Sequence, residues 1–200
     1  MSRIKYCYSL LCILAYQRIY NTNKQVFIFI YVLSSCKMVV ICNIVLVGKL
    51  DGISAEEIPK TRKRFNGVKI SLPKSTCLLF RNGAVTIVGV KSLEDAAKIP
   101  GYLACMFPNA TLTAPLRIVN IVGTTNAHSS LKLRNLYQLC KNNHLITYTP
   151  ETFPGMKITL RDNLVAIVFH TGKIVLTGAK STEDLLSAEV KILDIVKKII

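Results

Sequence analysis

The sequence predicts an α+β protein in which an antiparallel sheet carries helices on one face, with the whole unit built twice. Three observations predict it: blocks of sequence recur in the same order, hairpin signals break the apolar runs, and helical stretches open on acidic residues. Each unit therefore reads as a strand, a helix, several strands and a second helix. Helices on one face leave the other face of the sheet free.

An internal duplication indicates that the chain contains two equivalent units. Residues 42–45 (Cys-Asn-Ile-Val) recur as residues 119–122 (Val-Asn-Ile-Val). Three later blocks begin at Arg64, Leu78 and Val88, and they recur at offsets of 88, 89 and 89 positions. The first offset is 77, which indicates that the first unit lost residues early on. Ordered blocks at a near-constant offset indicate the duplication of one segment.

Each unit opens on an alternating apolar run, Val40–Val47 in the first and Arg117–Thr124 in the second. Such alternation predicts a strand. A helix is expected next. In the first unit residues 54–57 (Ser-Ala-Glu-Glu) have the pattern of a capping box. In the second unit four leucines mark one apolar face of a helix: Leu131, Leu133, Leu136 and Leu139.

Three or four strands rich in Val, Ile, Leu and Phe follow in each unit, broken by Asn82-Gly83 and Thr171-Gly172. Asn-Gly between apolar runs is a strong hairpin signal. A helix with an acidic first turn then closes each unit, after Ser92 and after Ser181. Pro100-Gly101 is expected to kink or shorten the first of these helices. The second is expected to run to Ile200 with five side chains inward: Leu185, Leu186, Val190, Leu193 and Val196.

The chain is strongly basic, with 26 Lys plus Arg against 11 Asp plus Glu and a net charge of +15. Self-repulsion of this size opposes compaction, so a polyanionic partner is expected, either nucleic acid or an acidic membrane face. Residues 39–200 keep +10 of the charge. The basic character therefore belongs to the globular part, which favours duplex DNA over a membrane.

No catalytic, metal or cofactor site is predicted. The seven cysteines are odd in number and form no Cys-x-x-Cys pair, which favours buried thiols over a disulfide framework or a zinc site. The three histidines are scattered, and no nucleophile–base–acid set accompanies them. We therefore expect a protein that is not an enzyme and uses no cofactor.

Residues 1–38 form an apolar, basic extension whose role is open. They hold five basic residues, no acid, and the apolar runs Tyr8–Tyr16 and Val26–Leu33. The second run is too short for a bilayer span of about 20 residues. A signal peptide, a membrane tether, a strand-forming tail and a mis-assigned gene start all remain open.

The free face of the sheet is expected to be apolar. In the strand that ends at Phe169, both sets of alternating side chains are apolar. A sheet buried on both faces shows the same pattern, but the chain has few helices to cover a second face. An apolar face with isolated Thr and Asn and a basic rim suits the DNA minor groove. Four phenylalanines fall at equivalent positions of the two units, either as DNA wedges or as symmetric core residues: Phe65, Phe80, Phe153 and Phe169.

Two segments of the second unit resemble a known family. Residues 148–155 read Tyr-Thr-Pro-Glu-Thr-Phe-Pro-Gly, and residues 167–180 read Ile-Val-Phe-His-Thr-Gly-Lys-Ile-Val-Leu-Thr-Gly-Ala-Lys. Both resemble the second repeat of the TATA-box-binding protein core, and residues 117–123 resemble the strand that opens that repeat. The resemblance extends over residues 39–200, and it is specific in the second repeat and weaker in the first.

The resemblance implies a saddle of two pseudo-symmetric repeats, with a curved sheet of ten antiparallel strands and about four helices on its convex face. Residues 1–38 would be the extension, residues 39–112 a shortened, divergent first repeat, and residues 113–200 the second repeat. The implied function is that of a general transcription factor of the nucleus, which binds and bends TATA-type DNA through the minor groove and nucleates the pre-initiation complex. A scaffold that binds transcription-factor partners with weak or no DNA binding is the alternative.

The resemblance also implies roles for single residues. Asn43 and Asn120 match asparagines that bond to base acceptors near the pseudo-dyad, Thr177 matches a base-contacting threonine, and Lys173 matches a phosphate contact. The implied DNA-binding set is Asn43, Val45, Phe65, Leu78, Phe80, Thr86, Val88, Asn120, Val122, Phe153, Ile167, Phe169, Lys173, Val175 and Thr177. Tyr148, Pro150 and Glu151 match a loop that contacts transcription factor IIB. Implied partners are duplex DNA, proteins like transcription factors IIB and IIA, and the RNA polymerase machinery, with no membrane partner.

The first repeat departs from the family pattern at two points. Val88 replaces a threonine, and Thr86 stands two residues earlier on the same strand face. Ala84 replaces a lysine that would contact phosphate, and Arg81 is a candidate substitute.

Overall fold

The computed structural model describes residues 39–53, 58, 67–142 and 145–200. Residues 40–200 form one compact unit, which is the subject of all that follows. The predicted extension at 1–38, the predicted capping box at 54–57 and Phe65 lie outside the described residues.

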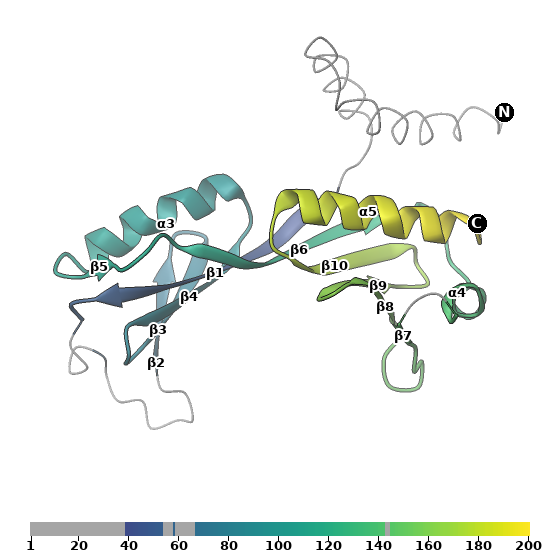
Figure 1. Ribbon diagram of the computed structural model, residues 1–200, viewed down its shortest axis with the longest axis horizontal. Helices are drawn as coiled ribbons and strands as arrows, with labels where there is room; N and C mark the ends of the chain where they lie inside the picture. Colours follow the sequence, from purple (N-terminus) through teal and green to yellow (C-terminus); the bar gives the residue numbers. More distant parts are fainter. Residues whose placement is uncertain (1–38, 54–57, 59–66, 143–144) are drawn as a thin grey trace, which may run out of the picture. The chain divides into compact units, whose positions relative to one another are not determined.

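Ten strands form one open antiparallel sheet (Figure 1). They are β1 (Val40–Asp51), β2 (Gly67–Leu72), β3 (Ser75–Phe80), β4 (Ala84–Val90), β5 (Thr111–Leu112), β6 (Arg117–Asn126), β7 (Ile146–Thr147), β8 (Met156–Arg161), β9 (Leu164–Val168) and β10 (Lys173–Ala179). Their order across the sheet is β2-β3-β4-β1-β6-β10-β9-β8-β7, and β5 pairs with the end of β1. The two predicted alternating runs are thus the two central strands, and both extend a few residues beyond the predicted ends.

The centre of the sheet has an approximate two-fold symmetry. In the β1–β6 pair, Ile44 lies opposite Ile121, Asn43 opposite Val122, and Val45 opposite Asn120. The predicted hairpin turns also match, since Gly83 and Gly172 both have positive φ, +79° and +85°. Backbone conformations of this kind favour glycine, so the same signal closes the β3–β4 and β9–β10 turns.

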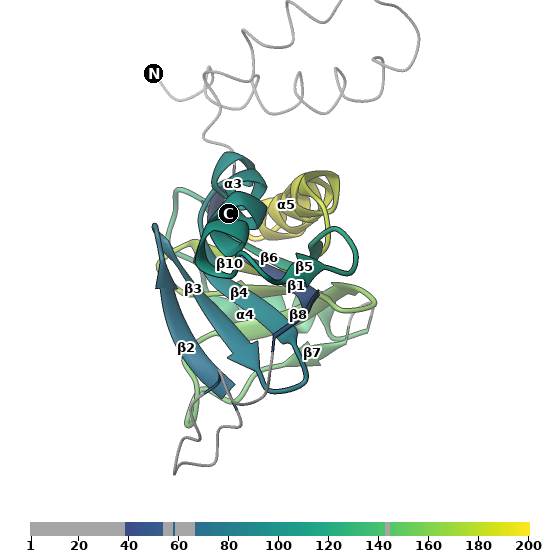
Figure 2. The same cartoon turned by 90° about the vertical axis from the view of Figure 1, so that its left-hand side faces the viewer.

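The described residues contain three helices, α3 (Leu93–Met106), α4 (Leu133–Cys140) and α5 (Thr182–Lys197). Two views show α3 and α5 on the same side of the sheet (Figures 1 and 2). Ser92 caps α3 and Ser181 caps α5, because their hydroxyls accept hydrogen bonds from the amides of Asp95 and Asp184 at 3.0 and 3.1 Å. The predicted starts of both helices are therefore confirmed.

Pro100-Gly101 is expected to kink or shorten α3, and the structure contradicts the shortening. The helix continues through Pro100 to Met106, and Ala96, Ile99 and Leu103 are buried along it. A proline inside a helix costs about 3 kcal/mol, while full burial of an Ile or a Leu contributes about 1.5–3 kcal/mol each. Packing against the sheet therefore outweighs the lost helical hydrogen bond.

The inward faces of the other two helices also differ from the prediction. In α4, Leu133, Leu136 and Cys140 are buried, whereas Leu139 is 41% exposed. Leu131 is buried but precedes the helix.

The predicted inward set of α5 mixes two apolar stripes, and the helix ends at Lys197 instead of Ile200. Leu186 and Val190 are exposed, and the side chains that face the core are Leu185, Ala188, Glu189, Ile192, Ile195 and Val196. Helical periodicity fits either stripe, and contact with the sheet selects the one that starts at Leu185.

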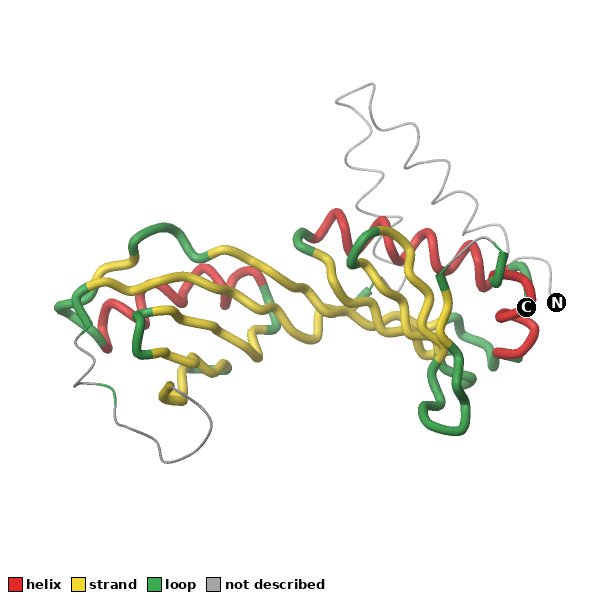
Figure 3. Tube along the Cα trace, turned by 60° about the horizontal axis from the view of Figure 1, so that its bottom comes forward, coloured by secondary structure: helices red, strands yellow, loops and turns green. Residues whose placement is uncertain are grey.

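The hydrophobic core lies between the sheet and its helices. It contains every second residue of the long strands, among them Ile44, Ile87, Ile121 and Leu176, each fully buried. A tube view shows the strands side by side across the sheet (Figure 3). Among the described helices, none combines the length and the hydropathy that crossing a membrane requires.

Candidate nucleic-acid interface

The sheet face opposite the helices is open and largely apolar, and we call it the open face. Its half-exposed strand residues alternate with the buried core residues, which confirms a free face over the described sheet. The open face includes Asn43, Val45, Val47, Ser71, Thr76, Leu78, Phe80, Thr86, Val88, Asn120, Val122, Thr124, Thr159, Val165, Ile167, Phe169, Val175 and Thr177. Of the fifteen residues predicted to bind DNA, fourteen are described, none is buried, and those on strands lie on this face or at its margin.

The two asparagines near the two-fold centre are held in the same way. Asn43 Oδ1 accepts a hydrogen bond from the Gly89 amide at 2.7 Å, and Asn120 Oδ1 accepts one from the Gly178 amide at 2.8 Å. Both glycines lie where the strand register shifts and have positive φ, +86° and +94°. A glycine bulge on the neighbouring strand therefore presents one amide N–H to each asparagine.

These hydrogen bonds fix which end of each side-chain amide is exposed. A backbone N–H can only donate, so the amide oxygen must face the glycine and the Nδ2 group must face the other way. Both asparagines thus offer N–H donors from the middle of an apolar face. Asn120 Nδ2 also donates to Thr177 Oγ1 at 3.5 Å, which leaves the Thr177 hydroxyl hydrogen free to donate further.

The two halves of the open face differ beside these asparagines. Val88 occupies in the first half the position that Thr177 occupies in the second, so Asn43 has no hydroxyl neighbour there. Across the strand pair the order is reversed, since Thr76 lies opposite Val88 and Val165 lies opposite Thr177. The first-half hydroxyls are therefore those of Thr76 and Thr86, together with that of Ser71, which lies opposite Thr76 on β2. The sequence did not indicate Thr76, because its position depends on the β3–β4 register.

Phe153 and Phe169 form an aromatic pair at the surface of the second half. Their ring centroids are 6.0 Å apart with an interplanar angle of 64°, and Phe153 is 37% exposed. A Cβ at Gly155 would lie 2.7 Å from the Phe153 ring and 3.0 Å from the Phe169 ring. Glycine at this position therefore makes room for the pair. The alternative that these two phenylalanines are symmetric core residues is wrong, and Phe80 in the first half is likewise half-exposed.

Four lysines surround the apolar centre of the open face. Lys173 is exposed at the start of β10, as expected, and lies opposite Asn126. Ala84 stands where the family pattern has a lysine. Lys49 lies directly opposite Ala84 on the neighbouring strand β1, so its amino group is one strand away from that position. Arg81 is not a free substitute, because its guanidinium donates to the carbonyl of Ile58 at 3.4 Å. Lys69 and Lys157, which the sequence reasoning missed, lie opposite Leu78 and Ile167.

Acidic residues are concentrated on the helical side. Of the nine described acids, six belong to α3 and α5, and Asp51 at the end of β1 is the one found in a strand. The six helical carboxylates lie away from the open-face lysines, and by strand alternation the one carboxylate described on the same face is Asp51, at the end of β1 two residues beyond Lys49. This separation of charge makes the open face the basic side of the sheet.

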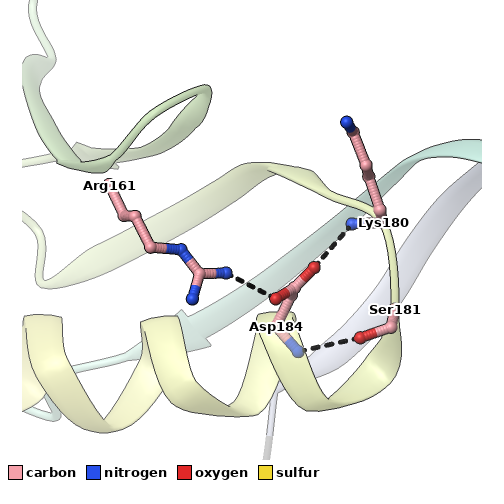
Figure 4. Close-up of polar contacts among 4 residues, drawn as sticks. All are labelled: Arg161, Lys180, Ser181 and Asp184. Carbon is pink, nitrogen blue, oxygen red and sulfur yellow. Dashed lines mark hydrogen bonds and ion pairs between the residues drawn. The ribbon is translucent and has the colours of Figure 1, made fainter.

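Asp184 ties the end of the sheet to the start of α5 (Figure 4). Its carboxylate accepts hydrogen bonds from Arg161 Nη2 at 2.5 Å and from the Lys180 amide at 3.3 Å. The Arg161 guanidinium, and then the Lys180 amide, hold the pKa of Asp184 below its usual value. The ion pair with Asp184 therefore holds the Arg161 guanidinium on the helical side of the sheet.

The loop with the predicted partner-binding residues is an ordered turn. The Thr149 carbonyl accepts hydrogen bonds from the amides of Thr152 and Phe153, both at 3.0 Å. Tyr148 packs on Tyr137 of α4 with ring centroids 6.4 Å apart, while Pro150 and Glu151 are exposed. The turn leads directly into Phe153, so the same backbone hydrogen bonds position both the exposed loop and this member of the aromatic pair.

The described thiols fall into two classes. Cys77 and Cys140 are buried, and burial raises both pKa values, that of Cys77 to about 11. Cys42 and Cys105 are exposed, with Cys105 on α3 and Cys42 in a bulge of β1. Cys42 Sγ lies 3.3 Å from Thr124 Oγ1, which places Cys42 on the open face. Within the described ranges no cluster of His, Cys, Asp and Glu could hold a metal ion.

Comparison with known proteins identifies the family. Residues 115–199 match the profile described as "Transcription factor TFIID (or TATA-binding protein, TBP)". The TATA-box-binding protein of Methanocaldococcus jannaschii is 32% identical over 174 residues, which is 80% of this chain and 93% of that protein. The one from Candida albicans is 33% identical over 63% of this chain and 55% of that protein.

A further relative and a solved structure agree with this. The TATA-box-binding protein of Sulfurisphaera tokodaii is 34% identical over 63% of this chain, and the match spans 65% of that protein's length. The solved structure of Methanococcus jannaschii TBP superimposes with a TM-score of 0.69 at 30% identity, over 81% of this chain and 99% of that one. It shares the saddle fold that the sequence predicted. The chain belongs to the TATA-box-binding protein family.

Proposed function

We propose that this chain is a general transcription factor that binds TATA-type promoter DNA through the minor groove, bends it, and nucleates the pre-initiation complex. The observation that carries the proposal is the pair of half-exposed asparagines at the centre of an apolar face, whose Oδ1 atoms are held by glycine amides so that their Nδ2 donors face the other way. Family membership supports the same function, since the relatives are named for binding the TATA box.

The chemistry of the asparagines fits A·T-rich DNA. In the minor groove A·T and T·A pairs present only acceptors, whereas G·C adds the amino donor of guanine. The donors of Asn43, Asn120 and Thr177 would pair with the acceptors and would oppose the guanine amino group. Valines opposite both asparagines, Val45 and Val122, fill the space between them. The open face therefore suits a narrow, A·T-rich groove.

The aromatic pair fits a second requirement, which is bending. An apolar wedge between base steps costs a few kcal/mol of unstacking, and wider contact with the bent duplex offsets that cost. Phe153 and Phe169 would form the wedge of the second half, and Phe65 and Phe80 that of the first. The remaining open-face residues, Leu78, Thr86, Val88, Ile167 and Val175, would line the groove, with Lys173 on phosphate.

The same proposal covers partners and location. The exposed turn with Tyr148, Pro150 and Glu151 would bind a protein like transcription factor IIB, and the DNA-bound chain would recruit a protein like transcription factor IIA and the RNA polymerase machinery. The chain would act without catalysis of its own. Relatives from the fungi Candida albicans and Emericella nidulans and from Acanthamoeba castellanii support a nuclear location.

Two exposed cysteines provide a direct test with an internal control. Cys42 lies on the open face and Cys105 on the outer side of α3, so DNA bound as proposed covers one thiol and not the other. The full chain is treated with iodoacetamide, with and without a TATA duplex, and modification of each cysteine is followed by peptide mass spectrometry. A duplex at ten times its Kd should slow modification of Cys42 by about tenfold.

The control and the sequence dependence decide the outcome. Modification of Cys105 should be unchanged, and a duplex with G·C pairs in place of TATA should protect Cys42 less at the same concentration. Equal modification of Cys42 with and without TATA duplex, in a chain that also fails to bind the duplex in solution, would refute the proposal. That result would favour the scaffold without DNA binding.

A further inference from the structure

We infer that Lys69 and Lys157 are a symmetric pair of phosphate contacts, one in each half of the open face, beside the sites where the aromatic wedges enter DNA. The inference rests on the proposed function and deepens it. Neither lysine belongs to the residues that the sequence indicated for DNA binding.

The strand register gives the two lysines equivalent positions. Lys69 on β2 lies opposite Leu78 on β3, and Lys157 on β8 lies opposite Ile167 on β9. Directly opposed side chains in an antiparallel pair share one face, so both lysines lie on the open face, and both are exposed. Each is one strand, about 4.8 Å, further from the two-fold centre than its apolar partner.

Lys157 is already positioned beside an aromatic wedge. Its Nζ lies 5.6 Å from the centroid of the Phe153 ring, within the range of a cation–π contact. A ring inserted between base steps lies inside the groove, and the phosphates of the kinked step lie beside it. The ammonium group therefore reaches the kink together with the ring, where it can pair with a phosphate.

Neither charge has a protein counter-ion among the described residues. The ion pairs there join Lys74 to Asp95, Arg161 to Asp184 and Lys198 to Asp194. An unpaired ammonium group repels the other positive charges of this basic chain, and a bound anion removes that repulsion. Both lysines are therefore suited to bind an anion.

Protection of a sheet edge explains only one of the two lysines. Lysines on edge strands discourage edge-to-edge association, and β2 is an edge strand. Lys157 is different, because it lies opposite Thr147 of β7 on one side and Ile167 of β9 on the other. A shared function on the open face accounts for both.

The test is the salt dependence of DNA binding. Lys69→Gln, Lys157→Gln and the double variant are compared with the wild type by fluorescence anisotropy on a labelled TATA duplex, from 50 to 200 mM KCl. Each lost phosphate contact lowers the slope of log K against log salt by about 0.9. Each single variant's affinity relative to wild type should therefore change about 3.5-fold over this range, and that of the double variant about 12-fold.

Two controls separate phosphate binding from other effects. Lys98→Gln on the outer side of α3 removes an equally exposed charge from the helical side and should leave the slope unchanged. Lys157→Arg keeps the charge and should keep the wild-type slope. Because phosphate contacts carry little sequence information, the loss should be equal on TATA and G·C-substituted duplexes.

The outcomes are distinct. The inference is overturned if the slope of log K against log salt changes as much in Lys98→Gln as in Lys157→Gln. It is also overturned if neither Lys69→Gln nor Lys157→Gln changes the slope. In both cases the proposed function stands. A wild-type chain that does not bind the TATA duplex overturns both.

Discussion

Substituting Asn120 by aspartate separates the two contacts of this side chain. Aspartate keeps an oxygen where Asn120 Oδ1 accepts the hydrogen bond of the Gly178 amide at 2.8 Å. It replaces the Nδ2 donor group, which faces the open side, by a second acceptor. Asn120→Asp should therefore fold normally and bind A·T pairs much more weakly.

The magnitudes follow from the contacts. Loss of a base hydrogen bond costs about 1–3 kcal/mol of binding, and an acceptor left facing a groove acceptor costs about 1–3 kcal/mol more. At 1.4 kcal/mol per tenfold in Kd, the sum of about 2–6 kcal/mol weakens binding about 30-fold to 20,000-fold. The free energy of unfolding should change by less than about 1 kcal/mol, because the Gly178 amide keeps its acceptor.

Two measurements on the same preparations test this reasoning: anisotropy titration of a TATA duplex at one fixed salt concentration, and urea denaturation. Asn120→Ala is the matched control, because it leaves the Gly178 amide without its acceptor and should lower the stability by about 1–3 kcal/mol as well as the affinity. Binding by Asn120→Asp within threefold of wild type would refute the assignment of Nδ2 to the groove. A large loss of stability in Asn120→Asp would refute the assignment of Oδ1 to Gly178.

Three further predictions concern the wedge and the sheet end. Phe153→Ala and Phe169→Ala should each reduce the bend angle of a TATA duplex labelled at both ends for energy transfer, and a double variant that bends normally contradicts the wedge. Gly155→Ala should weaken TATA binding, because its Cβ meets both rings at 2.7 and 3.0 Å; the same titration checks it, and unchanged affinity means that the rings need not hold this position. Asp184→Asn should lower stability at pH 7 by at most about 1 kcal/mol, since the ion pair with Arg161 is exposed. The folded pKa of Asp184 is lowered from 3.8, so its contribution is present above pH 3.8 and disappears as the pH falls through the folded value. The difference between wild type and Asp184→Asn in urea should therefore shrink on acidification, and a constant difference contradicts the ion-pair explanation.

Much of the fold follows from local sequence signals. Ser92 and Ser181 mark helix starts because a hydroxyl can satisfy a free amide of the first turn, and Gly83 and Gly172 mark hairpins because their turns need positive φ. Local signals fail where a contact with another element decides. The helix through Pro100 and the inward stripe of α5 are both set by packing against the sheet, which no pattern within the helix contains.

For the candidate interface, the amino-acid order is enough to show the duplication, the basic charge of residues 39–200, and the alternation that puts Asn43, Asn120 and Thr177 on one face of apolar strands. Those properties are local or periodic, so they can be read along the chain. Which hydrogen-bonding atoms each polar side chain offers at the open face depends on the folded sheet. The Asn43 and Asn120 amides are oriented by glycines 46 and 58 residues away, and Thr76, Lys69 and Lys157 reach the open face through strand register. Hydrogen bonding and register join residues distant in sequence, and for that reason only the folded sheet could show them.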